Sequence, residues 1–254
     1  MNNVFYIGAT GLAAQQTAVD TTANNIANLN TPAFKRGAVD FSALLTAGGR
    51  PTFVPGAGGA AGAGVSASMR PVYSSGTLRQ TDDAWDVAIR GNGFIELETA
   101  QGDAALWRGG RLRVGDDGYL RASNGVPLKA AISVPRDAER LEIAPDGQVL
   151  AVIPNQAAPL EIGRIDIVQP ADPHALQALG DGTYRISDDG AALIRTRAGE
   201  DNAGTLAQGF SEASNVALAD ELASLMLYQR AYAASARLVQ VGDELMAIAN
   251  GLKR

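Results

Sequence analysis

The sequence contains no cysteine and a single histidine, His174. Without cysteine the chain has no disulfide framework, thiol nucleophile or cysteine-based zinc site, and histidine-dependent catalysis would have to use His174. That residue lies in a proline-bounded loop at 170–176, and no Gly-x-Ser-x-Gly motif accompanies it, which favours a surface histidine. We therefore expect no catalytic residue, no metal site and no cofactor.

Acidic pairs at 82–83, 116–117 and 188–189 are the other candidates for chemistry, either as a glycosidase-like carboxylate pair or as calcium ligands. Their spacing does not fit an EF-hand loop, and the last two pairs run directly into glycine. We interpret those two as turns, and the first as a solvated entry to a strand.

Positive charge is scarce, with 21 basic against 27 acidic residues and a net charge of -6. Because no cluster of lysine and arginine could displace counterions from a phosphate backbone, we expect no nucleic-acid partner. No apolar run approaches the length of a membrane span, so we expect no membrane insertion. The first residues also lack the basic start and apolar run of a cleaved secretion signal.

The first 30 residues predict a helix with a seven-residue repeat, the spacing that keeps one seam facing a partner helix. Gly8 and Gly11 make this helix weak alone, because each glycine costs roughly 1 kcal/mol relative to alanine. We expect it to become stable on docking. The large seam residues are Phe5, Leu12, Val19 and Ile26.

The last 40 residues predict a second helix, with Ser214 or Asn215 as the N-cap and acidic residues early in it. Two apolar stripes indicate contacts on more than one side, with the first helix of the same chain and with a neighbouring molecule. One stripe holds Leu218, Leu222, Leu225, Tyr232 and Val239, and the other holds Leu238, Val241, Leu245, Ile248 and Leu252.

Between the helices the apolar period changes to two, as in Trp85, Val87 and Ile89, and Asn-Gly and Asp-Gly pairs mark tight turns. This pattern predicts short antiparallel strands. The boundaries we predict are 1–38 for the first helical part, 39–84 for an extended linker, 85–197 for an all-β domain, 198–213 for a return linker and 214–254 for the last helix.

A glycine- and proline-rich segment at 48–64 stands apart within the first linker. Such composition is typical of a flexible linker. The alternative is an extended arm that orders between neighbouring molecules, with Phe53 and Val54 as its anchors.

These patterns together predict an α+β fold in which N- and C-terminal helices pair in a coiled-coil-like module and bracket a mainly antiparallel β domain. Such a fold presents helices at both ends of the chain, where they can bundle with helices of other copies. This arrangement favours self-assembly into a polymer. We expect subunit packing through Phe5, Leu12, Val19, Ile26, Leu222, Leu225, Tyr232 and Leu245.

Three motifs resemble those of the bacterial flagellar rod and hook proteins. The first runs through Ala23, Asn24, Asn25, Ala27 and Asn28 to Thr31, Phe34, Lys35 and Arg36; the second is Asp86–Phe94; the third joins Glu212–Val216 to Gln229, Arg230, Ala231 and Tyr232. We expect the three asparagines either to bond between helices or to cap the helix end.

The similarity is greater to distal-rod members of the family than to proximal-rod members, although the short glycine-rich arm keeps the proximal assignment open. Ala33 stands where the family has glycine, so a turn with positive φ there would be strained, and Pro32 is an alternative way to fix the helix exit. Ser235 and Gly109 are further departures from the family's pattern.

The resemblance implies a structural subunit of the flagellar basal body that self-assembles into a helical tube, transmits torque from motor to hook and has no enzymatic activity. It implies as partners other copies of the chain, further rod and hook proteins, the bushing rings and the export apparatus. It also implies export through the flagellar type III apparatus and a location in the basal-body rod that crosses the periplasm. A β-rich surface-binding or carbohydrate-active module that uses the acidic turns remains the alternative from another class.

Overall fold

The computed structural model describes residues 2–44, 64–99, 104–154, 156, 158–186 and 192–251, and the predicted arm with Phe53 and Val54 lies outside them. One long helix near each end of the chain and a set of antiparallel strands between them confirm the predicted α+β fold class. The chain forms two compact units. Unit 1 comprises residues 1–27, 36–72 and 216–254, and unit 2 comprises residues 28–35 and 73–215.

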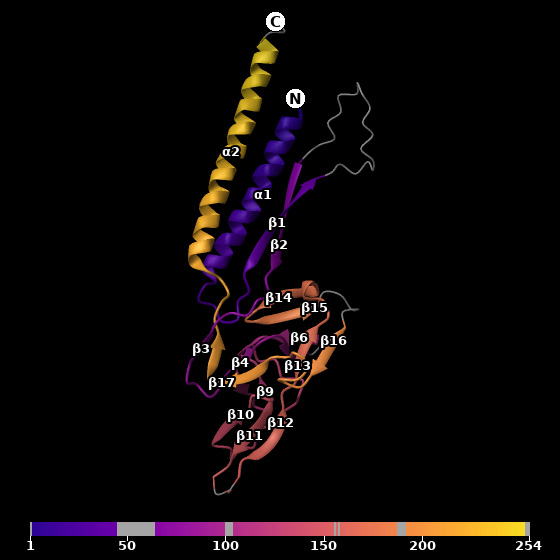
Figure 1. Ribbon diagram of the computed structural model, residues 1–254, viewed down its shortest axis with the longest axis vertical. Coiled ribbons are helices and arrows are strands. Elements are labelled where there is room, and N and C mark those ends of the chain that lie inside the picture. Colours follow the sequence, from indigo (N-terminus) through magenta and orange to yellow (C-terminus); the bar gives the residue numbers. More distant parts are fainter. Residues whose placement is uncertain are drawn as a thin grey trace. The chain divides into compact units, whose positions relative to one another are not determined.

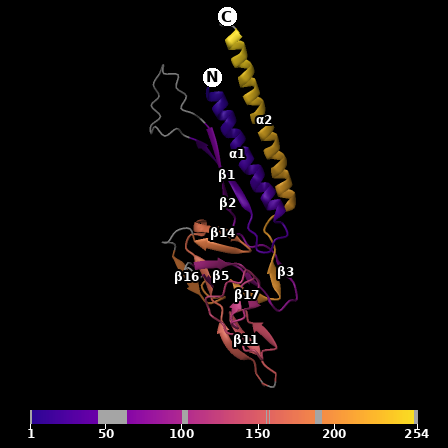
Figure 2. The same cartoon turned by 180° about the vertical axis from the view of Figure 1, so that it is seen from behind.

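Unit 1 is built from two helices and a hairpin. The helices are α1 (Asn2–Ala27) and α2 (Leu218–Gly251), which lie side by side and run in opposite directions in both views (Figures 1 and 2). The hairpin strands are β1 (Gly37–Leu44) and β2 (Gly64–Pro71), paired in antiparallel register along their whole length. The hairpin packs against α1, and the backbone N–H of Val65 donates to Thr10 Oγ1 at 3.4 Å.

The start of α2 differs from the expected position, because the helix begins at Leu218 and not directly after Ser214 or Asn215. The Asn215 side-chain amide donates to the carbonyl and the hydroxyl of Ser74, both at 3.1 Å. The first helical backbone bond runs from Glu221 N to Ala217 O at 3.1 Å.

Unit 2 is a set of small antiparallel sheets. A six-stranded sheet has the order β14 (Leu176–Gly180), β15 (Thr183–Ile186), β6 (Ala104–Trp107), β5 (Phe94–Glu98), β13 (Ile167–Pro170) and β16 (Leu193–Thr196). Two three-stranded sheets contain β10 (Arg140–Ile143), β11 (Gln148–Val152) and β12 (Leu160–Arg164), and β17 (Thr205–Gln208), β4 (Asp86–Arg90) and β7 (Gly109–Arg111). Two-stranded pairs join β18 (Phe210–Glu212) to β3 (Leu78–Gln80), and β8 (Arg113–Val114) to β9 (Leu120–Arg121).

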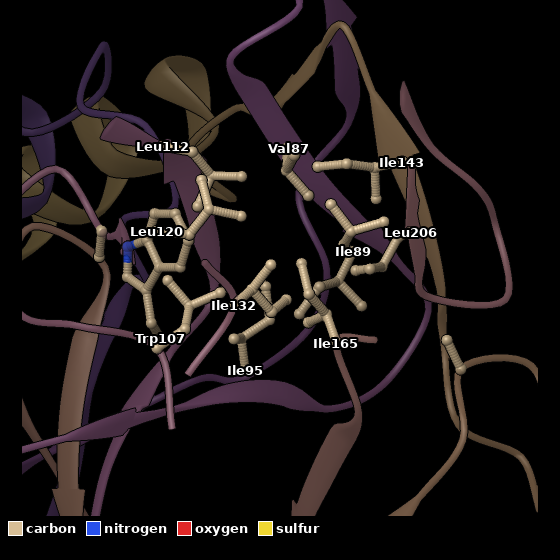
Figure 3. Close-up of a cluster of buried hydrophobic side chains, with 14 of the residues drawn as sticks. Val87, Ile89, Ile95, Trp107, Leu112, Leu120, Ile132, Ile143, Ile165 and Leu206 are labelled. Carbon is tan, nitrogen blue, oxygen red and sulfur yellow. The ribbon is translucent and has the colours of Figure 1, made fainter. Parts of the chain in front are cut away.

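Most of the alternating apolar residues of unit 2 meet in a large hydrophobic core (Figure 3), and a smaller second cluster contains Phe94, Leu106, Val168, Leu176 and Tyr184. Trp107 is the largest of the completely buried side chains and lies in this core. Branched side chains from several sheets fill the rest, as the period-two pattern predicts. The labelled members in Figure 3 are Val87, Ile89, Ile95, Trp107, Leu112, Leu120, Ile132, Ile143, Ile165 and Leu206.

At the Asn-Gly and Asp-Gly pairs that the structure describes, tight turns lie where the sequence predicts them. Gly125 and Gly147 have φ values of 82° and 90° at the predicted Asn-Gly and Asp-Gly turns. Ala33 also has a positive φ, 56°, so the strain expected where the family has glycine is present.

The segments predicted as linkers carry regular structure. Residues 39–84 include most of β1, all of β2 and the short β3, and residues 198–213 include β17 and β18. β2, β3, β17 and β18 are short or mix small and polar residues, so no clear period-two signal marks them in the sequence. β1 does alternate Val39, Phe41 and Ala43 with Asp40 and Ser42, and the prediction missed this strand.

Candidate subunit interface

The pairing of α1 with α2 depends on glycines that let the two backbones approach closely. A methyl group added at Gly8 would lie 2.5 Å from Val239 Cγ2, and one added at Gly242 would lie 3.3 Å from Phe5 Cζ. Large side chains of one helix therefore fit over small residues of the other, which is the packing expected of a close helix pair.

The buried line of α1 differs in composition from the seam that the seven-residue repeat suggests. Phe5, Leu12, Val19 and Ile26 are half-buried, whereas the fully buried residues are small or polar. The buried side chains are Ala14, Ala18, Thr22 and Asn25.

The α2 seam residues also divide by exposure. Leu225 is half-buried, but Leu222, Tyr232 and Leu245 are 45%, 41% and 54% exposed. The role of these residues in packing between subunits stays a prediction.

A second, exposed apolar line runs along α2. We call it the aliphatic face, and its members repeat at spacings of three and four when Ala231 and Ala234 are included, as in a coiled-coil seam. So many exposed large aliphatic residues on one helix indicate a surface that is covered by another molecule. The face consists of Leu227, Leu238, Val241, Leu245 and Ile248, exposed by 64%, 54%, 51%, 54% and 60%.

The family-like motifs contribute to two buried polar clusters. In unit 1, the Glu221 carboxylate accepts a hydrogen bond from Asn25 Nδ2 at 3.0 Å and an ion-paired bond from Arg36 Nε. The Asn25 amide also bonds both backbone groups of Gly37, donating to its carbonyl at 2.9 Å and accepting from its N–H at 2.8 Å. Glu221 is 1% exposed, so this cluster ties α1, α2 and the start of β1 together inside unit 1.

In unit 2, Glu212 is the centre of the other cluster. Its carboxylate accepts from Lys35 Nζ at 2.6 Å, from Arg108 Nε at 2.7 Å and from the backbone N–H of Gly76 at 2.7 Å. Burial lowers the pKa of the Lys35 ammonium, and the charge of Glu212 opposes that shift. Neighbouring Lys35 and Arg36 thus each pair with a glutamate of their own unit.

Sequence reasoning missed Arg108 and the roles of Glu212 and Glu221. It assigned Glu221 only to the helix dipole, because the partners of each glutamate are far away along the chain. One signal in the sequence could have indicated such pairing. Lys35 and Arg36 are adjacent basic residues of the first motif, and Glu212 and Glu221 lie in and just after the start of the third motif.

The second motif is largely buried through Val87, Ala88, Ile89 and Phe94, whereas several residues of the first and third motifs lie on the surface. Ala23, Asn24 and Ala27 of α1 and Gln229 and Arg230 of α2 are exposed. Asn28, Phe34 and Thr31 are partly buried, and Thr31 Oγ1 bonds Asn28 Oδ1 at 3.1 Å. Of the three asparagines, Asn25 makes the helix-to-helix bond that we proposed as one of their two roles.

The acidic pairs behave as turn and surface residues where they are described. Asp117 pairs with Arg121 at 2.6 Å beside the turn at Gly118, and Asp83 pairs with Arg111 at 2.9 Å. Within the described ranges, no group of three or more His, Cys, Asp or Glu residues could hold a metal ion. Among those same residues, no helix is both long and apolar enough to cross a membrane.

Comparison with known proteins gives three family models along the chain. Residues 5–35 match "Flagella basal body rod protein", residues 88–151 match "Flagellar hook protein FlgE/F/G D1 domain", and residues 207–252 match "Flagellar basal body rod FlgEFG protein C-terminal". The matched segments include most of α1, all of α2 and part of the β domain.

Curated relatives cover almost the whole chain. Flagellar basal-body rod protein FlgG of Agrobacterium fabrum is 33% identical over 251 residues, covering 95% of this chain and 96% of that protein. The FlgG protein of Buchnera aphidicola from Acyrthosiphon pisum is 31% identical over 250 residues, with the same coverage. Flagellar basal-body rod protein FlgF of Caulobacter vibrioides is 28% identical over 249 residues, covering 96% and 95%.

Proposed function

The chain belongs to the family of flagellar basal-body rod proteins, and from this premise we propose that it is a structural subunit of the distal rod. Its copies assemble into a helical tube that transmits torque from the motor to the hook. The higher identity to FlgG relatives than to the FlgF relative supports the distal position.

The aliphatic face of α2 is the observation that carries the assembly proposal. Complete burial of five large aliphatic side chains that are about half exposed contributes on the order of 5 kcal/mol. This contribution offsets part of the entropy lost when subunits join. A helix that is apolar on two sides suits a subunit that packs once within the chain and once against its neighbours.

Assembly also accounts for the weakness of α1. Gly8 and Gly11 lower its helix propensity, and α1 gains its stability from contact with α2 and the hairpin. We infer that the ends of the chain are more ordered in the assembled rod than in the dilute subunit, so that folding and polymerisation are coupled. Circular dichroism at rising concentration tests this point.

The further partners we propose are other rod and hook proteins, the surrounding bushing rings and the export apparatus. Export precedes assembly across the periplasm. The absence of cysteine agrees with passage of an unfolded chain that carries no disulfide.

Deletion of the coding gene in the source bacterium, followed by electron microscopy of purified basal bodies, tests the proposed function. We expect non-motile cells whose basal bodies stop before the hook, and a tagged full-length copy located in the hook-proximal part of the rod. A tag located nearer the inner membrane would replace the distal assignment with the proximal one. Motile cells with complete basal bodies would overturn the proposal.

A further inference from the structure

A line of four alanines, interrupted by Gln16 and Asp20, runs along the outward side of α1. We call it the small-residue face, and its members alternate at spacings of four and three, all of them exposed. It lies on the side of α1 away from the buried Ala18, Thr22 and Asn25. Its members are Ala9, Ala13, Gln16, Asp20, Ala23 and Ala27.

The aliphatic face of α2 repeats at the same residue spacing, but its side chains are large. Both lines repeat at three and four residues, so each forms a straight seam along its helix. Within one chain, α1 and α2 already meet by setting large side chains over small ones, with Val239 opposite Gly8 and Phe5 opposite Gly242. The two outward lines have the side-chain sizes needed to repeat that packing with another molecule.

We propose that the aliphatic face of α2 packs on the small-residue face of α1 in a second copy of this chain. This inference rests on the proposed function and identifies the two surfaces that meet. The α1 of the same chain is not available as this partner, because it already packs on another side of α2 through Gly8 and Gly11.

Charge at the edges of the two faces is complementary. Asp20 is the one charged residue in α1 and lies in the small-residue face, where its carboxylate also accepts a hydrogen bond from Gln16 Nε2 at 2.9 Å. On α2, exposed Arg230 and Arg237 follow one border of the aliphatic face one heptad apart, and the acidic Glu244 occupies the next heptad position of that border. The carboxylate of Asp20 therefore pairs with one of these guanidinium groups at the rim of the contact.

The use of two different surfaces has a consequence for assembly. A face that pairs with its own copy closes into a dimer, whereas two different faces form a head-to-tail contact that every added subunit repeats. Unless the rotation between subunits closes a ring, a leucine-to-alanine contact therefore builds an open helical polymer. Pairing of two aliphatic faces with each other is the competing arrangement, and it would stop at two chains.

Cysteine cross-linking separates the two arrangements, because the natural chain contains no cysteine. In a strain that lacks the natural copy, two full-length variants with different tags are produced together, one with a substitution on α1 and one on α2. Ala9→Cys, Ala13→Cys and Ala23→Cys are each combined with Leu238→Cys, Val241→Cys and Leu245→Cys, and purified basal bodies are treated with a mild oxidant.

We expect disulfides between the two tags for at least one pair, and none between two copies of the same α2 variant. Gln240→Cys, which is exposed on another side of α2, is the matched control and should remain uncross-linked. Disulfides between two aliphatic faces, or none from any pair in basal bodies that contain both tags, would overturn this inference and leave the proposed function standing. Absence of the natural chain from basal bodies would refute the proposed function itself.

A size test provides a second readout. Ala13→Trp should lower the amount of chain in basal bodies by about tenfold or more, because a bulky ring cannot fit in a close-packed helix contact. Ala247→Trp, an exposed alanine of α2 outside the aliphatic face, is the control and should assemble normally. Equal incorporation of both variants, at equal thermal stability of the subunits, would contradict the proposed contact.

Discussion

The side-chain amide of Asn25 donates a hydrogen bond to the carboxylate of Glu221 at 3.0 Å, although 196 positions separate the two residues in the sequence. Asn25 lies near the end of α1, and Glu221 lies in the first turn of α2. Both side chains are buried, at 2% and 1% exposure. A buried polar pair of this kind fixes the register of two helices, because any shift would break the buried hydrogen bond between them.

Replacement of Asn25 by alanine tests this bond. Asn25→Ala should lower the free energy of unfolding by about 2–4 kcal/mol, since Glu221 and both backbone groups of Gly37 lose a buried partner. Chemical denaturation followed by circular dichroism of the helices measures the change. Asn24→Ala, at the exposed neighbouring position, is the control and should cost less than about 1 kcal/mol. Equal effects of the two variants would contradict a special role for Asn25.

The Glu212 cluster makes a similar prediction for unit 2. Glu212→Gln should destabilise unit 2 by about 3–5 kcal/mol, because the buried cations Lys35 and Arg108 lose their shared carboxylate. The loss is measured by thermal unfolding monitored through tryptophan fluorescence. Glu200→Gln removes an exposed carboxylate 3.9 Å from Arg197 and should change stability by at most about 0.5 kcal/mol. A Glu212→Gln protein as stable as this control would show that the cluster does not stabilise the fold.

Glu96 should account for part of the pH dependence of folding stability. The hydrogen bond from Arg195, followed by the one from Lys129, lowers the pKa of Glu96 below its ordinary value of 4.5. The unfolded chain therefore binds more protons as the pH falls below about 4.5, and stability is lost in that range. Glu96→Gln should flatten the stability profile there, whereas Glu142→Gln, on the exposed Arg140 pair, should keep the natural slope. If stability falls with pH at the same slope in the natural protein and in both variants, Glu96 is not a source of the acid sensitivity.

The strained turn at Ala33 predicts a stabilising substitution. Ala33→Gly should raise the melting temperature, with a gain of up to about 1 kcal/mol, because glycine adopts a φ of 56° without the steric penalty of a methyl group. Ala122→Gly is the control at a buried alanine without positive φ, and it should destabilise the protein. A lower melting temperature for Ala33→Gly would mean that the buried methyl group outweighs the strain.

Local signals in the sequence predicted the local structure well. The period-two residues from Val87 to Ile89 lie in β4, and the Asn-Gly and Asp-Gly pairs at Gly125 and Gly147 adopt the positive φ of tight turns. The seven-residue repeat located α1, whose bounds are Asn2–Ala27. Each of these features depends on neighbouring residues, which is why periodicity and composition reveal it.

Contacts between distant segments were not predictable in the same way. Arg108 meets Glu212 across 104 positions, and nothing near Arg108 in the sequence distinguishes it from an exposed arginine. The β1–β2 hairpin was assigned to a linker although Val39, Phe41 and Ala43 alternate with Asp40 and Ser42 in β1, and its two strands lie on either side of the glycine- and proline-rich segment at 48–64. The predicted seam on α1 was drawn from its large residues, whereas glycine and alanine occupy much of the closest contact, since small residues permit the approach.

The central claim is that the aliphatic face of α2 holds subunits together in the rod. Its most direct test is the amount of full-length Leu238→Asp/Leu245→Asp double variant found in purified basal bodies, compared with a Gln240→Asp/Ala247→Asp control. All four positions are exposed, so both variants should melt at the temperature of the natural subunit. The account predicts that the control enters the rod and restores motility, and that the aliphatic-face variant does neither. Normal incorporation of the aliphatic-face variant, with restored motility, would contradict it.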